Sequence, residues 1–144
     1  MNYWIFGLPI IAGLLTQAIK VIVEGFKNKF SWNLFSKYGG MPSSHSAFVF
    51  GLLAEIVSID GIYSTTFATA LILTILIVRD ATGFRRLMDS QAKAINKLTE
   101  KLPADKQNDI NHLPENIGHT PLQITIGALL GVAIVILGNL ILTK

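Results

Sequence analysis

Four stretches of this chain are nearly free of charge and long enough, or almost long enough, to cross a lipid bilayer. A helix needs about 20 apolar residues to span the hydrocarbon core. The stretches are Tyr3 to Ile19, which continues through Lys20 to Val23, Ser46 to Ile59, Gly61 to Val78, and Leu122 to Leu142. None alternates with a period of two residues, which a membrane barrel would require. The sequence therefore predicts four transmembrane helices.

Composition excludes several other classes of protein. Only 15% of the 144 residues are charged and 51% are hydrophobic, whereas an ordinary soluble domain carries about 25% charged residues. The absence of cysteine excludes a disulfide scaffold, a thiolate metal site and a cysteine nucleophile. The net charge is +3, but the basic residues are not interleaved with aromatic ones, so we expect no nucleic-acid partner. We predict one all-α domain, 1–144, an integral membrane bundle.

The distribution of Lys and Arg predicts the orientation of the bundle. The second connection, around Ile59 to Ile62, contains only Asp60 among charged residues. The first and third connections are basic, and contain Lys27, Lys29 and Lys37, and Arg79, Arg85, Arg86, Lys93, Lys97, Lys101 and Lys106. Short cytoplasmic loops hold the excess of basic residues, so we expect a multi-pass protein of the plasma membrane with both basic connections in the cytoplasm. The first helix has no preceding basic residue or cleavage site and is expected to be retained.

The third connection contains an amphipathic pattern. Apolar residues recur at three- and four-residue steps, at Leu87, Met88, Ala92, Ile95, Leu98 and Leu102, with basic residues between them. Such a helix is typical of one lying on a membrane surface. The alternative is a helix that packs on the rest of the protein and exposes its charged face. The polar stretch from Pro103 to Asn116 is predicted to be a loop.

The first cluster that could support chemistry precedes the second predicted helix, at Gly39-Gly40-Met41-Pro42-Ser43-Ser44-His45-Ser46-Ala47. Either Ser43 or Ser44 is suited to cap the helix. A helix that begins here directs free backbone N–H groups and the positive end of its dipole outward, which favours an anion. His45 is expected in the first turn.

Two further clusters are expected at the same face of the membrane. In Gly118-His119-Thr120-Pro121-Leu122-Gln123, Thr120 and Gln123 fit a capping box with Pro121 as the first helical residue. His119 then lies at a second helix N-terminus. Asp80-Ala81-Thr82-Gly83-Phe84-Arg85-Arg86 supplies two guanidinium groups, whose planar donors match phosphate oxygens. Each cluster alone also fits a structural role, as a helix cap or a lipid anchor, but together they describe a phosphate site with a nucleophile and an acid.

These three motifs, with Gln91-Ala92 after the arginine pair, resemble a divergent branch of small membrane proteins in the type 2 phosphatidic acid phosphatase superfamily, which is also described as acid phosphatase/vanadium haloperoxidase-related. The resemblance covers nearly the whole chain. The main superfamily has three blocks, K-x6-R-P, P-S-G-H and S-R-x5-H-x3-D. The resemblance implies metal-independent hydrolysis of a lipid or isoprenoid phosphate through a phosphohistidine, with no cofactor.

The resemblance also implies roles for individual residues. Pro42, Ser43 and His45 match the second block, with Ser44 in place of its glycine, so His45 would be the general acid. His119 matches the histidine of the third block and would be the nucleophile. The phosphate would be bound by Lys20, Ser43, Ser44, Arg85 and Arg86. Lys20 matches the lysine of the first block. Lys27 stands at the arginine position of that block, but no proline follows it.

The residue that orients the nucleophile is the main departure from the superfamily. Its third block has an aspartate four residues after the histidine, where this chain has Gln123. If Gln123 only closes the capping box, Asp80 is the alternative acid to orient His119.

Other functions stay open at this stage. The missing aspartate suggests a non-catalytic protein that binds lipid phosphates, and Glu55, within a predicted membrane helix, suggests a small transporter or an interhelical hydrogen bond. A haloperoxidase role is least favoured. Gly127 and Gly131 form a G-x-x-x-G pattern, which is typical of close helix packing and raises a homodimer as one option.

Overall fold

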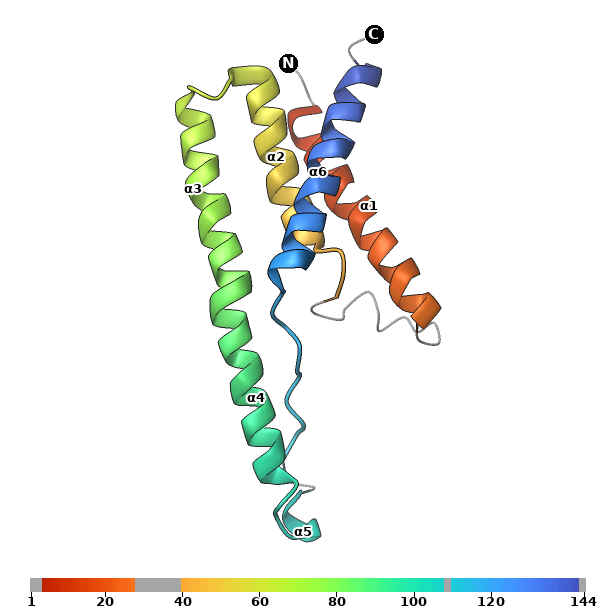
Figure 1. The fold of residues 1–144 in the computed structure, drawn as a ribbon, viewed down its shortest axis with the longest axis vertical. Helices are drawn as coiled ribbons and strands as arrows, with labels where there is room; N and C mark the ends of the chain where they lie inside the picture. Colours follow the sequence, from red (N-terminus) through yellow and green to blue (C-terminus); the bar gives the residue numbers. More distant parts are fainter. Residues whose placement is uncertain (1–3, 28–39, 108–109, 143–144) are drawn as a thin grey trace.

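A computed structural model describes residues 4–27, 40–107 and 110–142, and every regular element in these ranges is a helix. The elements are α1 (Trp4–Lys27), α2 (Ser44–Asp60), α3 (Thr65–Arg79), a π-helical turn (Asp80–Phe84), α4 (Arg85–Thr99), α5 (Ala104–Gln107) and α6 (Pro121–Leu142). Helices α1, α2 and α6 pack together, and α3 lies beside α2 (Figure 1). The predicted all-α bundle is confirmed.

Three helices in the described ranges are long and apolar enough to cross a membrane. They are Phe6–Phe26, the continuous helix Thr65–Thr99 and Pro121–Leu142. The fourth predicted helix, α2, has only 17 residues but buries seven of them, Ser46, Ala47, Val49, Gly51, Leu53, Glu55 and Ile56. Helix α2 therefore forms the centre of the bundle. It is about 25 Å long and packs against the longer helices α1 and α6.

Two glycines of α6 allow it to lie against α2. A methyl group on Gly127 would overlap the carbonyl of Ser43, and one on Gly131 would overlap the carbonyl of Ala47. The G-x-x-x-G pattern thus serves contact within the chain, the usual effect of small residues at a helix crossing in membranes. The homodimer stays an untested prediction, and this pattern no longer supports it.

The core of the bundle is small and contains one buried carboxylate. Leu8, Ala12 and Val135 form its apolar centre. Glu55 is 1% exposed and accepts a hydrogen bond from the side-chain amide of Asn139 at 2.7 Å. Because an unpaired charge in a membrane is costly, this bond explains Glu55 as a link between α2 and α6, as the interhelical option predicts.

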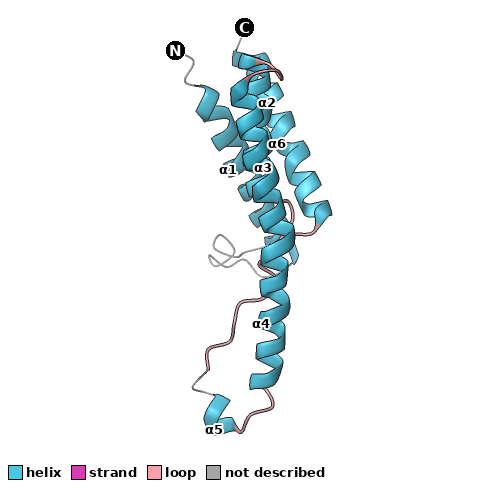
Figure 2. Ribbon diagram, turned by 90° about the vertical axis from the view of Figure 1, so that its left-hand side faces the viewer, coloured by secondary structure: helices cyan, strands magenta, loops and turns pink. Residues whose placement is uncertain are grey.

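The amphipathic helix is present as α4, but its direction differs from the expected one. Instead of turning to lie on the membrane surface, α4 continues from α3 through the π-helical turn as one long rod that extends beyond the bundle (Figures 1 and 2). The backbone stays hydrogen-bonded at the turn, since the N–H of Arg85 donates to the carbonyl of Asp80. Hydropathy predicted a break here because it detects the change from apolar to polar residues and not the continuity of the backbone.

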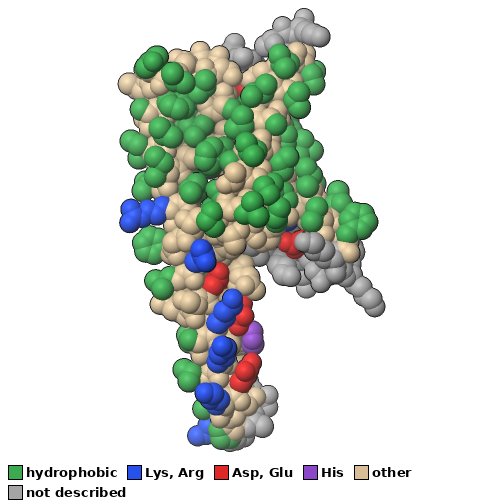
Figure 3. Space-filling view, in the orientation of Figure 1, with side chains coloured by type: hydrophobic (Ala, Val, Ile, Leu, Met, Phe, Trp, Pro, Cys, Tyr) green, Lys and Arg blue, Asp and Glu red, His purple; other side chains and the backbone are tan. Residues whose placement is uncertain are grey.

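The two ends of the bundle differ in character. The start of α1, the end of α6 and the α2–α3 connection lie at one end, and the starts of α2 and α6 lie at the other (Figure 1). Apolar side chains cover the visible face of the bundle, while Lys, Arg, Asp and Glu follow the extension formed by α4 (Figure 3). The structure therefore separates an apolar body from a charged end that contains all three motifs. Of the residues used to predict orientation, Lys29 and Lys37 lie outside the described ranges, as does Gly39 of the first motif.

Candidate active site

The start of α2 is fixed by Ser43. Its hydroxyl caps the helix, accepting the backbone N–H of Ser46 at 3.3 Å and the hydroxyl of Ser46 at 3.0 Å. Its own N–H donates to the carbonyl of Gln123 at 3.2 Å, which ties the start of α2 to α6. Ser43 is 2% exposed. Of the two serines that the sequence offered as the cap, Ser43 takes this role, and it sets His45 in the first turn of α2.

The start of α6 is fixed by the predicted capping box. The N–H of Thr120 donates to the side-chain oxygen of Gln123 at 2.8 Å, and the N–H of Gln123 donates to the hydroxyl of Thr120 at 3.3 Å. This reciprocal pair satisfies two N–H groups at the start of the helix. His119 directly precedes it, and its N–H donates to the carbonyl of Ala81, in the π-helical turn, at 3.1 Å.

A further residue, Asp89 of α4, holds the segment before His119. Its two carboxylate oxygens accept the N–H of Ile117 at 2.6 Å and the N–H of Gly118 at 2.9 Å. A side chain at position 118 would collide with Arg86, so glycine permits this close approach. The sequence analysis missed Asp89 because its partners are backbone groups far along the chain, and only its position near the arginine pair would have drawn attention to it.

A second polar contact from α4 supports the same segment. The amide group of Asn96 donates to the carbonyl of Leu113 at 3.0 Å and to the carboxylate of Glu115 at 2.8 Å, and its oxygen accepts the N–H of Leu113 at 3.0 Å. Asn96 is 5% exposed. The segment that leads back to α6 is therefore bound to α4 by the side chains of Asn96 and Asp89. These bonds set the position of His119 relative to the bundle.

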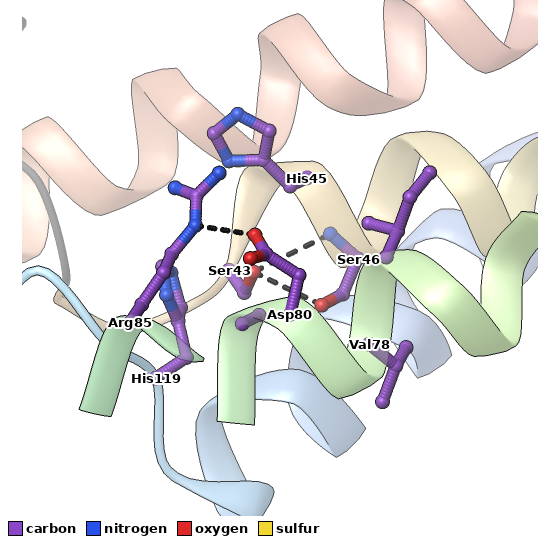
Figure 4. A pocket seen from close by; sticks show the side chains of 9 residues that line it. Ser43, His45, Ser46, Val78, Asp80, Arg85 and His119 are labelled. Atoms are coloured by element: carbon purple, nitrogen blue, oxygen red, sulfur yellow. Dashed lines mark hydrogen bonds and ion pairs between the residues drawn. The ribbon is translucent and has the colours of Figure 1, made fainter. Parts of the chain in front are cut away.

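Both candidate histidines line one small cavity. Its volume is about 30 Å³, and it is lined by Ser43, His45, Ser46, Ile77, Val78, Asp80, Ala81, Arg85 and His119. Arg85 donates from Nε to the carboxylate of Asp80 at 2.8 Å, and its guanidinium group extends toward the histidines (Figure 4). The three motifs, which are far apart in the sequence, thus meet at one point.

His119 is buried beside several positive groups. It is 6% exposed. Burial, and then the charges of Lys20, His45 and Arg85, lower the pKa of His119 from 6.5 to about 4, while Asp89 acts in the opposite direction. The imidazole is therefore neutral at physiological pH, as a nucleophile must be. Its Nδ1 atom has no hydrogen-bond partner among the described residues.

The other predicted phosphate ligands take different positions around this cavity. Lys20 is 5% exposed and acts electrostatically on both histidines. Arg86 lines an adjoining polar cavity of about 400 Å³, which His119 also borders. Ser44 lines a groove on the opposite side of His45. The side chain of Lys27 lies outside the described part of the structure.

Neither residue predicted to orient His119 forms a hydrogen bond with it in the described structure. The side-chain oxygen of Gln123 is bonded in the capping box, and the carboxylate of Asp80 is bonded to Arg85. Gln123 thus closes the capping box, as the alternative for it predicted, whereas Asp80, the alternative acid, holds Arg85 instead of His119. Asp89 is the carboxylate that acts on His119, through charge and through the backbone before it.

The cluster is basic in character. In the described ranges, no three His, Asp or Glu side chains come together in an arrangement that could hold a metal ion. What converges instead is two imidazoles, a guanidinium group, a buried ammonium group and two helix N-termini. Such donors suit a doubly charged anion, since oriented N–H groups and cations both stabilise it.

Comparison with known proteins finds a family and a relative. The sequence profile described as the Divergent PAP2 family matches residues 1–134. A protein of Bacillus subtilis (strain 168), described as uncharacterized membrane protein YuiD, is 35% identical over 132 residues, which cover 83% of this chain and 83% of that protein. No solved structure matches the chain significantly.

Proposed function

Because this chain belongs to the Divergent PAP2 family, we propose that it is a membrane phosphatase that hydrolyses a lipid or isoprenoid phosphate through a phosphohistidine. The observation that carries the proposal is the shared cavity of His45 and His119, with Arg85 in its wall and the buried Lys20 nearby. A phosphatase of this kind needs a nucleophile, a proton donor and fixed positive charge around one phosphoryl group.

The steps follow from the groups present. His119 attacks phosphorus, and His45 donates a proton to the leaving oxygen. Lys20, Arg85 and the N-termini of α2 and α6 stabilise the charge that spreads over the equatorial oxygens. Water then attacks the phosphohistidine and releases phosphate. A proton donor contributes about 10²–10⁴-fold to such a rate, so loss of His45 should slow turnover strongly and leave substrate binding in place.

The class of substrate follows from the surroundings of the site. The catalytic end of the bundle adjoins helices that are apolar enough to span a membrane, which favours a phosphate carried by a lipid such as phosphatidate, phosphatidylglycerophosphate or an isoprenoid phosphate. We place the active site on the cytoplasmic face of the plasma membrane, because basic residues of the third connection, Arg85, Arg86 and Lys93, lie at that end.

Phosphate release by the purified protein tests the proposal. We expect hydrolysis of at least one lipid phosphate from a panel of these three types, no hydrolysis by His119→Ala, and inhibition by vanadate, whose trigonal-bipyramidal form resembles the transferring phosphoryl group. Undiminished turnover by His119→Ala would refute the mechanism. Tight binding of a lipid phosphate without turnover would favour the non-catalytic alternative.

A further inference from the structure

A groove runs along the membrane-spanning part of α1, beside α2. Its volume is about 450 Å³, and its apolar walls are formed by Ile10, Gly13, Leu14 and Phe48. Gly13 keeps the groove open, since a Cβ atom there would lie 3.3 Å from that of Phe48. Its residues on α1, Ile10, Gly13, Leu14 and Gln17, fall within the span Phe6–Phe26, so this wall of the groove lies at the depth of the bilayer interior. In a bilayer the groove would therefore be in contact with the hydrocarbon chains of lipids.

One end of the groove is polar and reaches the active site. Gln17, Ser44 and His45 line it there, and His45 also lines the small cavity that it shares with His119. Ile10 and Gln17 are separated by about 10 Å along α1, so the groove leads from the interior of the membrane to the first turn of α2. His45 is thus the boundary between the groove and the catalytic cavity.

On the side of His119, the site opens into a polar cavity instead of an apolar groove. His119 borders the polar cavity of about 400 Å³, together with Arg86, Lys93 and Asn116. The two histidines therefore separate two environments, an apolar groove on the side of His45 and a polar, basic cavity on the side of His119. In an in-line displacement the nucleophile and the leaving group occupy opposite sides of phosphorus.

From this polarity we propose that the groove binds the hydrocarbon chain of the substrate's leaving group, with Gly13, Leu14 and Phe48 as residues that select the chain. The inference rests on the proposed phosphatase function. The P–O bond breaks on the side of His45, which gives its proton to the alcohol oxygen, while the P–N bond forms at His119. Water then adds to phosphorus, its proton passes to His45, the P–N bond breaks, and phosphate leaves through the polar cavity. The alcohol stays in the groove and returns to the bilayer.

A bulky residue in the groove should discriminate against long chains. The hydrocarbon chain of the substrate comes from a bilayer that is as apolar as the groove. Its binding therefore depends on how well its shape fits the groove and not on its removal from water. Leu14 is 65% exposed, and Leu14→Trp fills the groove without entering the core. Leu15 is 48% exposed at the same depth and does not line the groove. Leu15→Trp is therefore the matched control.

We expect Leu14→Trp to lower kcat/KM for hexadecyl phosphate by about 10-fold, an effect of overfilling a packed space, and to leave ethyl phosphate within about 2-fold. Leu15→Trp should change neither. Equal losses on both substrates, or equal effects of the two variants on hexadecyl phosphate, would overturn the assignment.

A labelling experiment tests the groove even if the protein proves not to turn over substrate. A hexadecyl phosphate with a diazirine in the middle of its chain should label Ile10, Leu14 or Phe48 in both the wild-type protein and His119→Ala. The same chain with a trimethylammonium head should label these residues several-fold less. Equal labelling by the two probes, or labelling spread evenly over the exposed residues of α3, would show a groove filled by any bilayer chain and refute the proposal.

Discussion

At the scale of single residues, Asp89 holds the segment that directly precedes His119. Asp89→Asn removes the charge that acts on His119 and leaves one of two N–H groups facing an amide donor instead of an acceptor. Loss of a hydrogen bond to a charged group costs about 1.5–3 kcal/mol. We therefore expect kcat to fall by about 10-fold or more with a smaller change in KM, and the pKa of His119, followed by NMR of labelled histidine, to fall further. The exposed carboxylate Glu100 offers a control, since Glu100→Gln should leave both quantities unchanged.

The lowered pKa of His119 also predicts how stability depends on pH. The unfolded chain binds a proton at this histidine near pH 6.5, and the folded chain does so only near pH 4. Between these values the unfolded state holds more protons, so the free energy of unfolding decreases as the pH falls. The contribution is about 2–3 kcal/mol at pH 4.5. Unfolding in detergent at pH 7.5 and 4.5 should show a smaller pH dependence for His119→Gln than for the wild-type protein; identical dependences would contradict the assigned pKa.

At the scale of elements, substitutions in the capping box of α6 test whether Gln123 stabilises the start of the helix or takes part in catalysis. Gln123→Ala removes one side of the box, and we expect it to lower the free energy of unfolding by about 1 kcal/mol while kcat changes by less than about 3-fold. Gln123→Glu keeps an acceptor for the N–H of Thr120 and should keep both. A large gain in kcat for Gln123→Glu would instead show that this position faces His119 during catalysis.

The crossing of α2 and α6 depends on Gly131. Gly131→Ala introduces a methyl group where the carbonyl of Ala47 lies, and overpacking of this kind costs about 1–3 kcal/mol. Because the same crossing aligns His45 with His119, we expect stability and turnover to fall together, as measured by unfolding in detergent and by phosphate release. Gly83→Ala is the control, since its added methyl group contacts nothing in the described structure.

The sequence predicted the elements well and their contacts less well. Apolar runs and the caps of Ser43 and Thr120 are local signals, so the helices and both histidines could be identified. The partners of Asp80 and Asp89 could not be predicted, because a carboxylate gives no sign of which backbone or side-chain group it will meet in the folded chain. The pattern at Gly127 and Gly131 indicated close packing but not which helix would be the partner.

At the scale of the whole molecule, the basic residues predict that the end containing His45 and His119 faces the cytoplasm. The absence of cysteine allows single-cysteine labelling in intact cells with a membrane-impermeant maleimide. Tyr63 is 98% exposed in the α2–α3 connection, and Tyr63→Cys should react from outside. Lys93→Cys, on α4 at the catalytic end, should react only after the membrane is opened. The reverse pattern would invert the predicted orientation.

The most direct test of the central claim is to trap the phosphorylated enzyme. Purified protein is incubated briefly with a lipid phosphate carrying labelled phosphorus and then denatured in alkali, in which a phosphohistidine survives. The account predicts labelled protein for the wild type, with the phosphate on His119 by mass spectrometry, and none for His119→Ala. Phosphate release without a labelled intermediate, or label on another residue, would contradict it.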